Sequence, residues 1–174
     1  MNELNNDIYW LHGQQSNRFA VYFSFTAPGS LPEYNLMPGS IYHAKLCFYK
    51  GVGNLRALFK ECELSGETYV PHFCSNLQEA ASRYRETLQI NPFAENVPIL
   101  VENIRLSVQG KQLYIQDVND ERMPVQMQET TKTDILAVTG GKPFSAFLLA
   151  DANCWELNTM WYQSNCYIWR DEHN

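Results

Sequence analysis

Cysteine and histidine are the side chains in this sequence whose chemistry could hold a metal ion. Cys62, His72 and Cys74 could supply three zinc ligands, with Cys47 or Cys154 as a fourth. Structural zinc sites usually contain two close pairs of ligands, such as C-x-x-C followed by a second C-x-x-C. Here His72 and Cys74 are the single close pair, and isolated cysteines are common as small apolar core residues. The spacing therefore does not predict a metal site, and we expect no cofactor.

Catalytic motifs are equally weak in this chain. A nucleophilic cysteine needs a base within hydrogen-bond reach, and no cysteine here stands in a recognisable nucleophile context. The carboxylates Asp117, Asp120 and Glu121 cluster in an expected hairpin turn, where aspartate is favoured for its backbone hydrogen bonds. No phosphate-binding loop of the G-x-x-x-x-G-K-[ST] type is present. The sequence names no reaction, and an enzyme with a spatially assembled Cys/His or carboxylate site is kept as an alternative.

The charge balance bears on the partners of the chain. Its 174 residues include 13 basic and 19 acidic side chains, for a net charge of −6. Nucleic-acid binding depends largely on lysine and arginine, so a nucleic-acid-binding accessory domain is a further alternative and not the favoured function. Lys50, Arg56 and Lys60 could form a small basic patch, although a solvated face is the expected explanation. The charged fraction of 18% is low, and a surface with few charges tolerates contact with another protein.

The sequence also bears on the compartment. The first residues lack the basic and continuous apolar segments of a secretory signal, and the longest apolar runs are too short to span a bilayer. The five cysteines are odd in number and widely scattered, which is typical of reduced thiols. We therefore expect a cytoplasmic protein that does not enter a membrane.

Two stretches predict the main strands of a sheet. Arg18–Thr26 alternates aromatic and β-branched residues with smaller ones, and its expected partner is Ile41–Tyr49. The side chains expected to face the core are Phe19, Val21, Phe23 and Phe25. The connection Ala27–Ser40 contains three prolines and two glycines, so we expect either a functional loop or a strap across one end of the sheet.

One amphipathic helix is predicted over Asn76–Ile90. Its apolar residues recur at helical spacing, and Asn91-Pro92 ends it. Ser75 and Gln78 match a capping box at its start. Leu55–Leu64 is apolar in pattern but does not distinguish a strand from a helix.

The second half of the chain predicts a hairpin followed by a meander. Pro98–Val108 and Gln112–Val118 flank a glycine turn, and short apolar segments follow from Asp134 onward. We expect strands at Ile135–Thr139, Pro143–Ala150, Cys154–Tyr162 and Cys166–Trp169. The aromatic residues of this region are expected in the core, with peptide binding as the alternative: Trp155, Trp161, Tyr162, Tyr167 and Trp169.

These patterns predict an α+β fold dominated by β structure. We expect an antiparallel sheet or a partly open barrel with one main amphipathic helix and a C-terminal β-meander. A single domain over residues 1–174 is expected, with a sub-division into residues 1–74, 75–91 and 98–170.

Three segments carry a family resemblance. Tyr9–Phe25, Met37–Glu61 and Asn91–Leu106 contain a Gln-Gln-x-x-Arg-Phe strand, a Leu-Arg-Ala-Leu stretch and an Asn-Pro-Phe stretch. In that order they resemble the C-terminal region of bacterial SWIM zinc-finger family proteins. The final stretch from Gly140 onward is similar to the end of those chains.

The resemblance implies a role in an assembly. The family's C-x-C and C-x-H zinc motif is absent here, so neither its zinc nor its presumed DNA- or protein-binding role carries over. Similar proteins are encoded beside MoxR-type AAA+ ATPases and von Willebrand A-domain proteins, which the resemblance implies as partners. We therefore favour a non-catalytic protein-interaction or scaffold module.

The resemblance also names candidate binding residues. The residues that match the family's pattern most closely are Gln14, Gln15, Arg18, Arg56 and Asn103. Strand-end hydrogen bonds or a buried arginine pair would explain these residues equally well.

Overall fold

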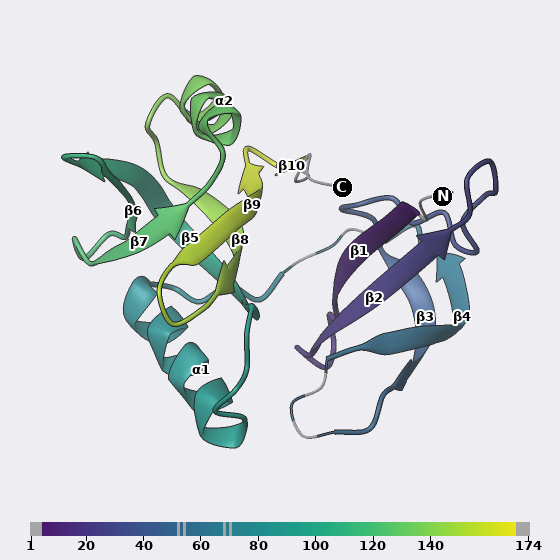
Figure 1. Ribbon diagram of the computed structural model, residues 1–174. Coiled ribbons are helices and arrows are strands. Elements are labelled where there is room, and N and C mark those ends of the chain that lie inside the picture. The colour runs from purple at the N-terminus through teal and green to yellow at the C-terminus, as the bar shows by residue number, and fades with distance from the viewer. Residues whose placement is uncertain (1–4, 52, 54, 68, 70, 170–174) are drawn as a thin grey trace. The chain divides into compact units, whose positions relative to one another are not determined.

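The computed structural model describes residues 5–51, 53, 55–67, 69 and 71–169 (Figure 1). Contacts divide the chain into two compact units, the first within residues 1–72 and the second over residues 73–170. Most of the regular structure is strand, which confirms the β-dominant α+β fold. The boundary lies close to the expected sub-division after residue 74, and the single domain over residues 1–174 stays a prediction.

The first unit is built from two antiparallel strand pairs. β1 (Asn5–His12) pairs with β2 (Phe19–Thr26), and β3 (Tyr42–Phe48) pairs with β4 (Ala57–Leu64). The predicted pairing of Arg18–Thr26 with Ile41–Tyr49 is therefore wrong. A short turn joins β1 to β2, and closing a short loop costs less chain entropy than closing the long proline-containing one.

β2 buries the face opposite to the one that the sequence predicts. Ala20, Tyr22, Ser24 and Thr26 are buried, whereas Phe25 on the other face is 59% exposed. The Tyr22 ring packs edge-on against Phe59, with 4.9 Å between centroids. The small Ala20 and Ser24 side chains leave room for this aromatic packing between the strand pairs. The assignment of the phenylalanines of β2 to the core is therefore wrong.

The loop between β2 and β3 contributes to the same core. Leu36 is buried, and the Tyr34 ring lies 5.1 Å from Phe59 and 6.2 Å from Tyr22. Of the two expectations for Ala27–Ser40, these contacts favour the strap.

The second unit contains a closed five-stranded barrel. Its strands are β5 (Val97–Gln109), β6 (Gln112–Gln116), β7 (Arg122–Gln126), β8 (Phe144–Ala150) and β9 (Trp155–Tyr162). β5 pairs with β6, β6 with β7, β7 with β9, β9 with β8, and β8 again with β5. The β7–β9 pairing is parallel and the others are antiparallel. With a helix between its third and fourth strands, this is the Greek-key order of the OB-fold.

The meander is present, but it begins later than predicted. β8, β9 and β10 (Asn165–Ile168) are successive antiparallel neighbours. The strand predicted at Ile135–Thr139 is wrong, because these residues belong to helix α2 (Glu129–Thr139). The Thr139 hydroxyl donates to the Ile135 carbonyl oxygen at 2.8 Å, and Gly140 ends the helix at φ 59°. The described chain thus has two helices instead of one main helix.

Helices α1 (Leu77–Ile90) and α2 lie at opposite ends of the barrel (Figure 1). Leu77 and Ala80 of α1 and Ile135 of α2 belong to the barrel core. The largest fully buried apolar side chains of that core are Val101, Ile104, Ile115, Val125, Ile135, Leu148 and Met160. Each helix therefore places apolar side chains into the barrel interior.

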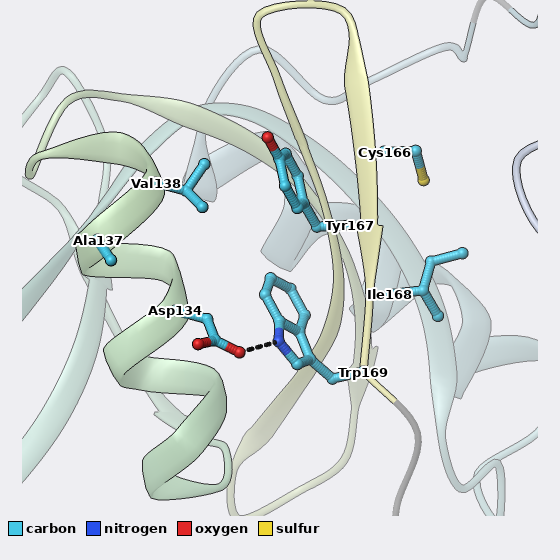
Figure 2. A pocket seen from close by; sticks show the side chains of 7 residues that line it. All are labelled: Asp134, Ala137, Val138, Cys166, Tyr167, Ile168 and Trp169. Atoms are coloured by element: carbon cyan, nitrogen blue, oxygen red, sulfur yellow. Dashed lines mark hydrogen bonds between the residues drawn. The ribbon is translucent and has the colours of Figure 1, made fainter.

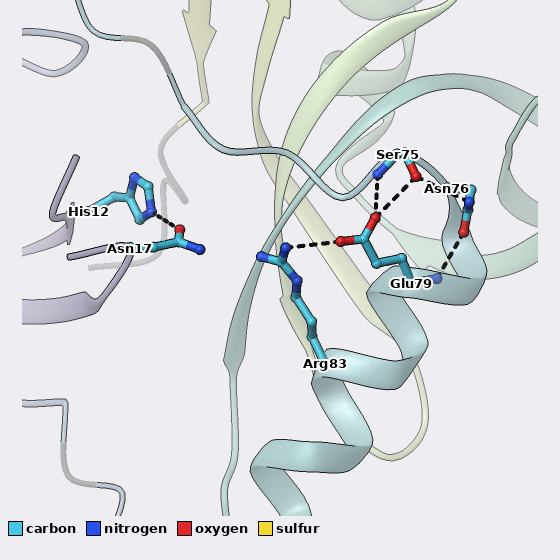
Figure 3. A network of polar contacts seen from close by, with 6 residues as sticks. All are labelled: His12, Asn17, Ser75, Asn76, Glu79 and Arg83. Carbon is cyan, nitrogen blue, oxygen red and sulfur yellow. Dashed lines mark hydrogen bonds and ion pairs between the residues drawn. The ribbon is translucent and has the colours of Figure 1, made fainter. Parts of the chain in front are cut away.

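Asn76 caps the first turn of α1. Its side-chain oxygen accepts the Glu79 N–H at 2.8 Å, and the Glu79 carboxylate accepts the Ser75 N–H at 2.8 Å (Figure 3). The predicted helix is confirmed, but the cap lies one residue later than the predicted Ser75–Gln78 box. The Ser75 backbone amide, with the Ser75 hydroxyl and Arg83, lowers the pKa of Glu79.

A buried carboxylate ties the β6–β7 turn to the start of α1. Asp117 is 1% exposed. Its Oδ2 accepts the Leu77 N–H at 2.9 Å, and its Oδ1 accepts the N–H groups of Asn119 and Glu121 at 2.9 and 3.1 Å. Backbone hydrogen bonds thus account for this aspartate, as the sequence analysis expects for a turn.

We predict that Asp117→Asn destabilises the protein by about 1–3 kcal/mol, because the amide offers one acceptor atom where two are needed. The measurement is the urea unfolding midpoint at pH 7. Asp120→Asn in the same turn is the matched control, since Asp120 is exposed at φ 62°, a conformation that asparagine tolerates. Equal midpoints for the two variants would contradict the structural role of Asp117.

Candidate functional site

Both candidate arginines, Arg18 and Arg56, lie on aromatic rings of the first unit. The Arg56 guanidinium carbon is 5.0 Å from the Phe23 ring centroid and 4.8 Å from that of Tyr49. The Arg18 guanidinium carbon is 4.7 Å from the Phe48 centroid. Both arginines are exposed, so the alternative of a buried arginine pair is wrong. Cation–π contact holds each guanidinium against aromatic rings of the first unit.

The other matching residues occupy turns and irregular strand positions. Gln14 and Gln15 lie in the β1–β2 turn, where the Gly13 N–H donates to the Arg18 carbonyl oxygen at 2.8 Å. Asn103 is exposed at φ 56° in β5, where the pairing with β8 shifts register between Val101 and Ile104. The structure brings Gln14, Gln15 and Arg18 to one end of the β1–β2 hairpin. Asn103 belongs to the other unit.

The conformation of Asn103 predicts a stability effect. Asn103→Gly should be nearly neutral, because glycine adopts a positive φ without strain. Asn103→Val should destabilise by about 1–2 kcal/mol, because a β-branched residue is strained there. Thermal unfolding of both variants checks this. Equal melting temperatures for the valine and glycine variants would show that the backbone does not select this residue.

The hairpin of β1 and β2 carries apolar side chains on its outward face. Ile8 lies opposite Phe23 and Trp10 opposite Val21, and cross-strand partners share a face. The Phe25 ring stacks beside that of Phe23, with 6.4 Å between centroids and 13° between planes. Ile8 is 53% exposed. We call these five residues the apolar face.

The apolar face is the feature that the sequence analysis missed. The alternation in β2 predicts that its phenylalanines face the core, whereas Tyr22 on the opposite side is the buried aromatic residue. The available signal was that β2 is rich in apolar side chains on both sides. Such a strand either lies between two layers or presents one apolar side at the surface.

His12 is held by polar side chains within the first unit. Its Nδ1 lies 2.7 Å from the Tyr69 hydroxyl oxygen. Its Nε2 lies 2.7 Å from the Asn17 Oδ1, a contact drawn in Figure 3. A neutral imidazole with a proton on Nε2 satisfies both contacts, since the tyrosine donates and the asparagine accepts. The His12 ring also packs 4.7 Å from that of Phe19. These contacts fix the orientation of the His12 ring, which connects the hairpin to Tyr69 by a hydrogen bond.

The cysteines do not form a ligand set in the part of the chain that the structure describes. No three histidine, cysteine, aspartate or glutamate side chains of those residues come together in a way that could hold a metal ion. Cys62 and Cys74 belong to different units. All five cysteines are free thiols. Cys74 is fully buried, and desolvation raises its pKa to about 11, which opposes a role as a nucleophile.

Thiol reactivity should follow this difference in burial. We expect iodoacetamide at pH 8 to modify the exposed Cys47 at least about a hundredfold faster than Cys74, because little of the Cys74 thiol is ionised at that pH. Mass spectrometry of the digested protein over time measures both rates. In 8 M urea the two rates should converge, and similar rates in the folded protein would contradict the burial of Cys74.

A pocket of about 390 Å³ lies between α2 and β10 (Figure 2). The Trp169 indole N–H donates to the Asp134 carboxylate at 3.0 Å, so this carboxylate already has a partner. Cys166 points to the side of β10 away from Asp134 (Figure 2). The pocket therefore does not assemble the cysteine–base pair that an enzyme of the alternative class needs.

Most of the aromatic residues of the C-terminal meander contribute to the core of the second unit. Trp155 is buried, and Tyr162, Tyr167 and Trp169 pack against the barrel core. Trp161 packs edge-on against Phe73, with 5.5 Å between centroids. The expected core role is therefore confirmed for Trp155, Tyr162, Tyr167 and Trp169 and not for Trp161.

No protein-family model, curated protein or solved structure matches this chain. The resemblance to the C-terminal region of SWIM zinc-finger family proteins therefore stays a prediction. Among the helices of the described residues, none has the length and apolar character needed to cross a membrane. The fold and the apolar face define a β-rich protein with exposed apolar side chains on the β1–β2 hairpin.

Proposed function

We propose that this chain is a non-catalytic protein-interaction module, and that the apolar face of β1 and β2 is its binding surface. The observation that carries the proposal is the exposure of Ile8 and Phe25 beside Trp10 and Phe23 on a two-sided apolar sheet. Leaving such side chains in water costs about 25 cal/mol per Å² of apolar area, a free energy that a partner recovers by covering them.

The partner is inferred to present apolar side chains that cover this face. Arg56 lies over Phe23 and Tyr49 at the margin of the apolar face. Tryptophan, tyrosine and arginine are also the residues most often found at the energetic centre of protein interfaces. The resemblance makes a MoxR-type AAA+ ATPase or a von Willebrand A-domain protein the partner to test first. Free thiols support the cytoplasm as the compartment.

Replacing Phe25 tests the proposal. We expect Phe25→Ser to weaken binding to the purified ATPase or A-domain protein of the same host by roughly tenfold or more, because the variant loses the most exposed aromatic contact of the face. Phe93→Ser is the matched control, since Phe93 is 89% exposed in the second unit and outside the apolar face. Calorimetric titration gives the dissociation constants.

Two results would overturn the proposal. One is a dissociation constant that is the same for Phe25→Ser as for the wild type, which would place the interface elsewhere. The other is an equal loss in both variants, which would show that neither phenylalanine reports on a specific contact. Circular dichroism of each variant confirms that the strands are intact.

A further inference from the structure

The outward face of β5, β6 and β7 shows a regular arrangement of arginine, glutamine and tyrosine. The strand register aligns Arg105, Gln116 and Arg122 in one cross-strand row. The next row contains Ser107, Tyr114 and Pro124, and Gln109 lies opposite Gln112 in the third. The side chains between these positions point inward, and Ile104, Ile115 and Val125 are buried in the core. We call the three outward rows the ladder face.

The ladder face carries two exposed arginines in an acidic chain. Its rows contain two guanidinium groups and no carboxylate. The nearby carboxylates lie in the β6–β7 turn. Asp117 is buried on backbone amides, Asp120 accepts the Gln116 side-chain N–H at 2.7 Å, and Glu121 is exposed next to Arg122 in the sequence. Arg105 and Arg122 are exposed, so their charges face solvent.

We propose that the ladder face binds single-stranded nucleic acid. Tyr114 is half-buried in the middle row and offers a ring on which a base can stack. Arg105 and Arg122 flank Gln116 two strand spacings apart, about 10 Å, so that a crossing backbone can place a phosphate near each. The Arg122 Nη1 donates to the Gln109 Oε1 at 3.4 Å, which orients this guanidinium across β6.

The strand order of the barrel supports the same ligand. β6 and β7 are the second and third strands of the barrel, and this is the face with which OB-folds bind oligonucleotides. This support is an analogy of fold, and the charge and the tyrosine of the ladder face carry the argument. The site lies in the second unit, so it is distinct from the apolar face and goes beyond the proposed protein interaction.

The test is fluorescence anisotropy of labelled dT15 and rU15 with the full chain at 50 and 200 mM NaCl. We expect Arg105→Gln/Arg122→Gln to weaken binding at least tenfold and to reduce the slope of log K against log salt by about 1.4, since two phosphate contacts are lost. Arg85→Gln/Lys142→Gln is the matched control, because it removes the same charge from exposed positions outside the face. This control should bind like wild type.

Tyr114 provides a test that does not depend on charge. Tyr114→Leu should weaken binding roughly fivefold or more through lost stacking, whereas Tyr114→Phe should retain wild-type affinity. The proposal is overturned if the wild type does not bind either oligonucleotide at 50 mM NaCl, or if both double variants lose affinity equally. It is also overturned if poly-glutamate of matched length displaces dT15 as well as unlabelled dT15 does, because the face would then select acidic peptides. Comparison of dT15 with rU15 shows whether DNA or RNA is preferred.

Discussion

The barrel of the second unit depends on one strand that serves two partners. The first part of β5 pairs with β8 up to Ile104 and its last part pairs with β6 from Arg105, and the register shift at Asn103 lies just before this change. A bulge bends a strand and increases its twist, which lets a short sheet curl until its edges meet. Without this bend, β8 and β6 would lie on opposite edges of a flat sheet and the core would open to water. The ladder face exists because the last part of β5 follows β6 and β7 around the curve.

Local signals in the sequence predict several elements of this fold well. The helix at Leu77–Ile90 follows from the helical spacing of its apolar residues and from the proline after it. The β5–β6 hairpin follows from its glycine turn. Each of these signals lies within or next to the element that it predicts. Helix α2 was missed because Ile135, Leu136, Ala137 and Val138 form a continuous apolar run without a period, which is consistent with a strand or a helix. Packing against the neighbouring elements decides that this run forms a helix.

Long-range features were harder to predict for a physical reason. β2 has apolar side chains on both sides, so its pattern does not say which side meets the core. That choice depends on Phe59 and Tyr34, which come from distant parts of the chain. The family resemblance identified Arg18 and Arg56, whose guanidinium groups lie over aromatic rings of the first unit. It gave no indication of Tyr114 or Arg122, because the ladder face follows only from the register of three strands.

Net charge and local charge answer different questions about this protein. A net charge of −6 slows the approach of a polyanion, but at physiological salt this field is screened beyond about 8 Å. At contact distance, the ladder face presents arginine and amide groups, and the apolar face presents phenylalanine, isoleucine and one bordering arginine. Apolar area favours a protein partner, while paired guanidinium groups around a tyrosine favour phosphates and bases. Since the two faces belong to separate units, occupation of one does not use the residues of the other, and a chain bearing both ligands would act as an adaptor between them.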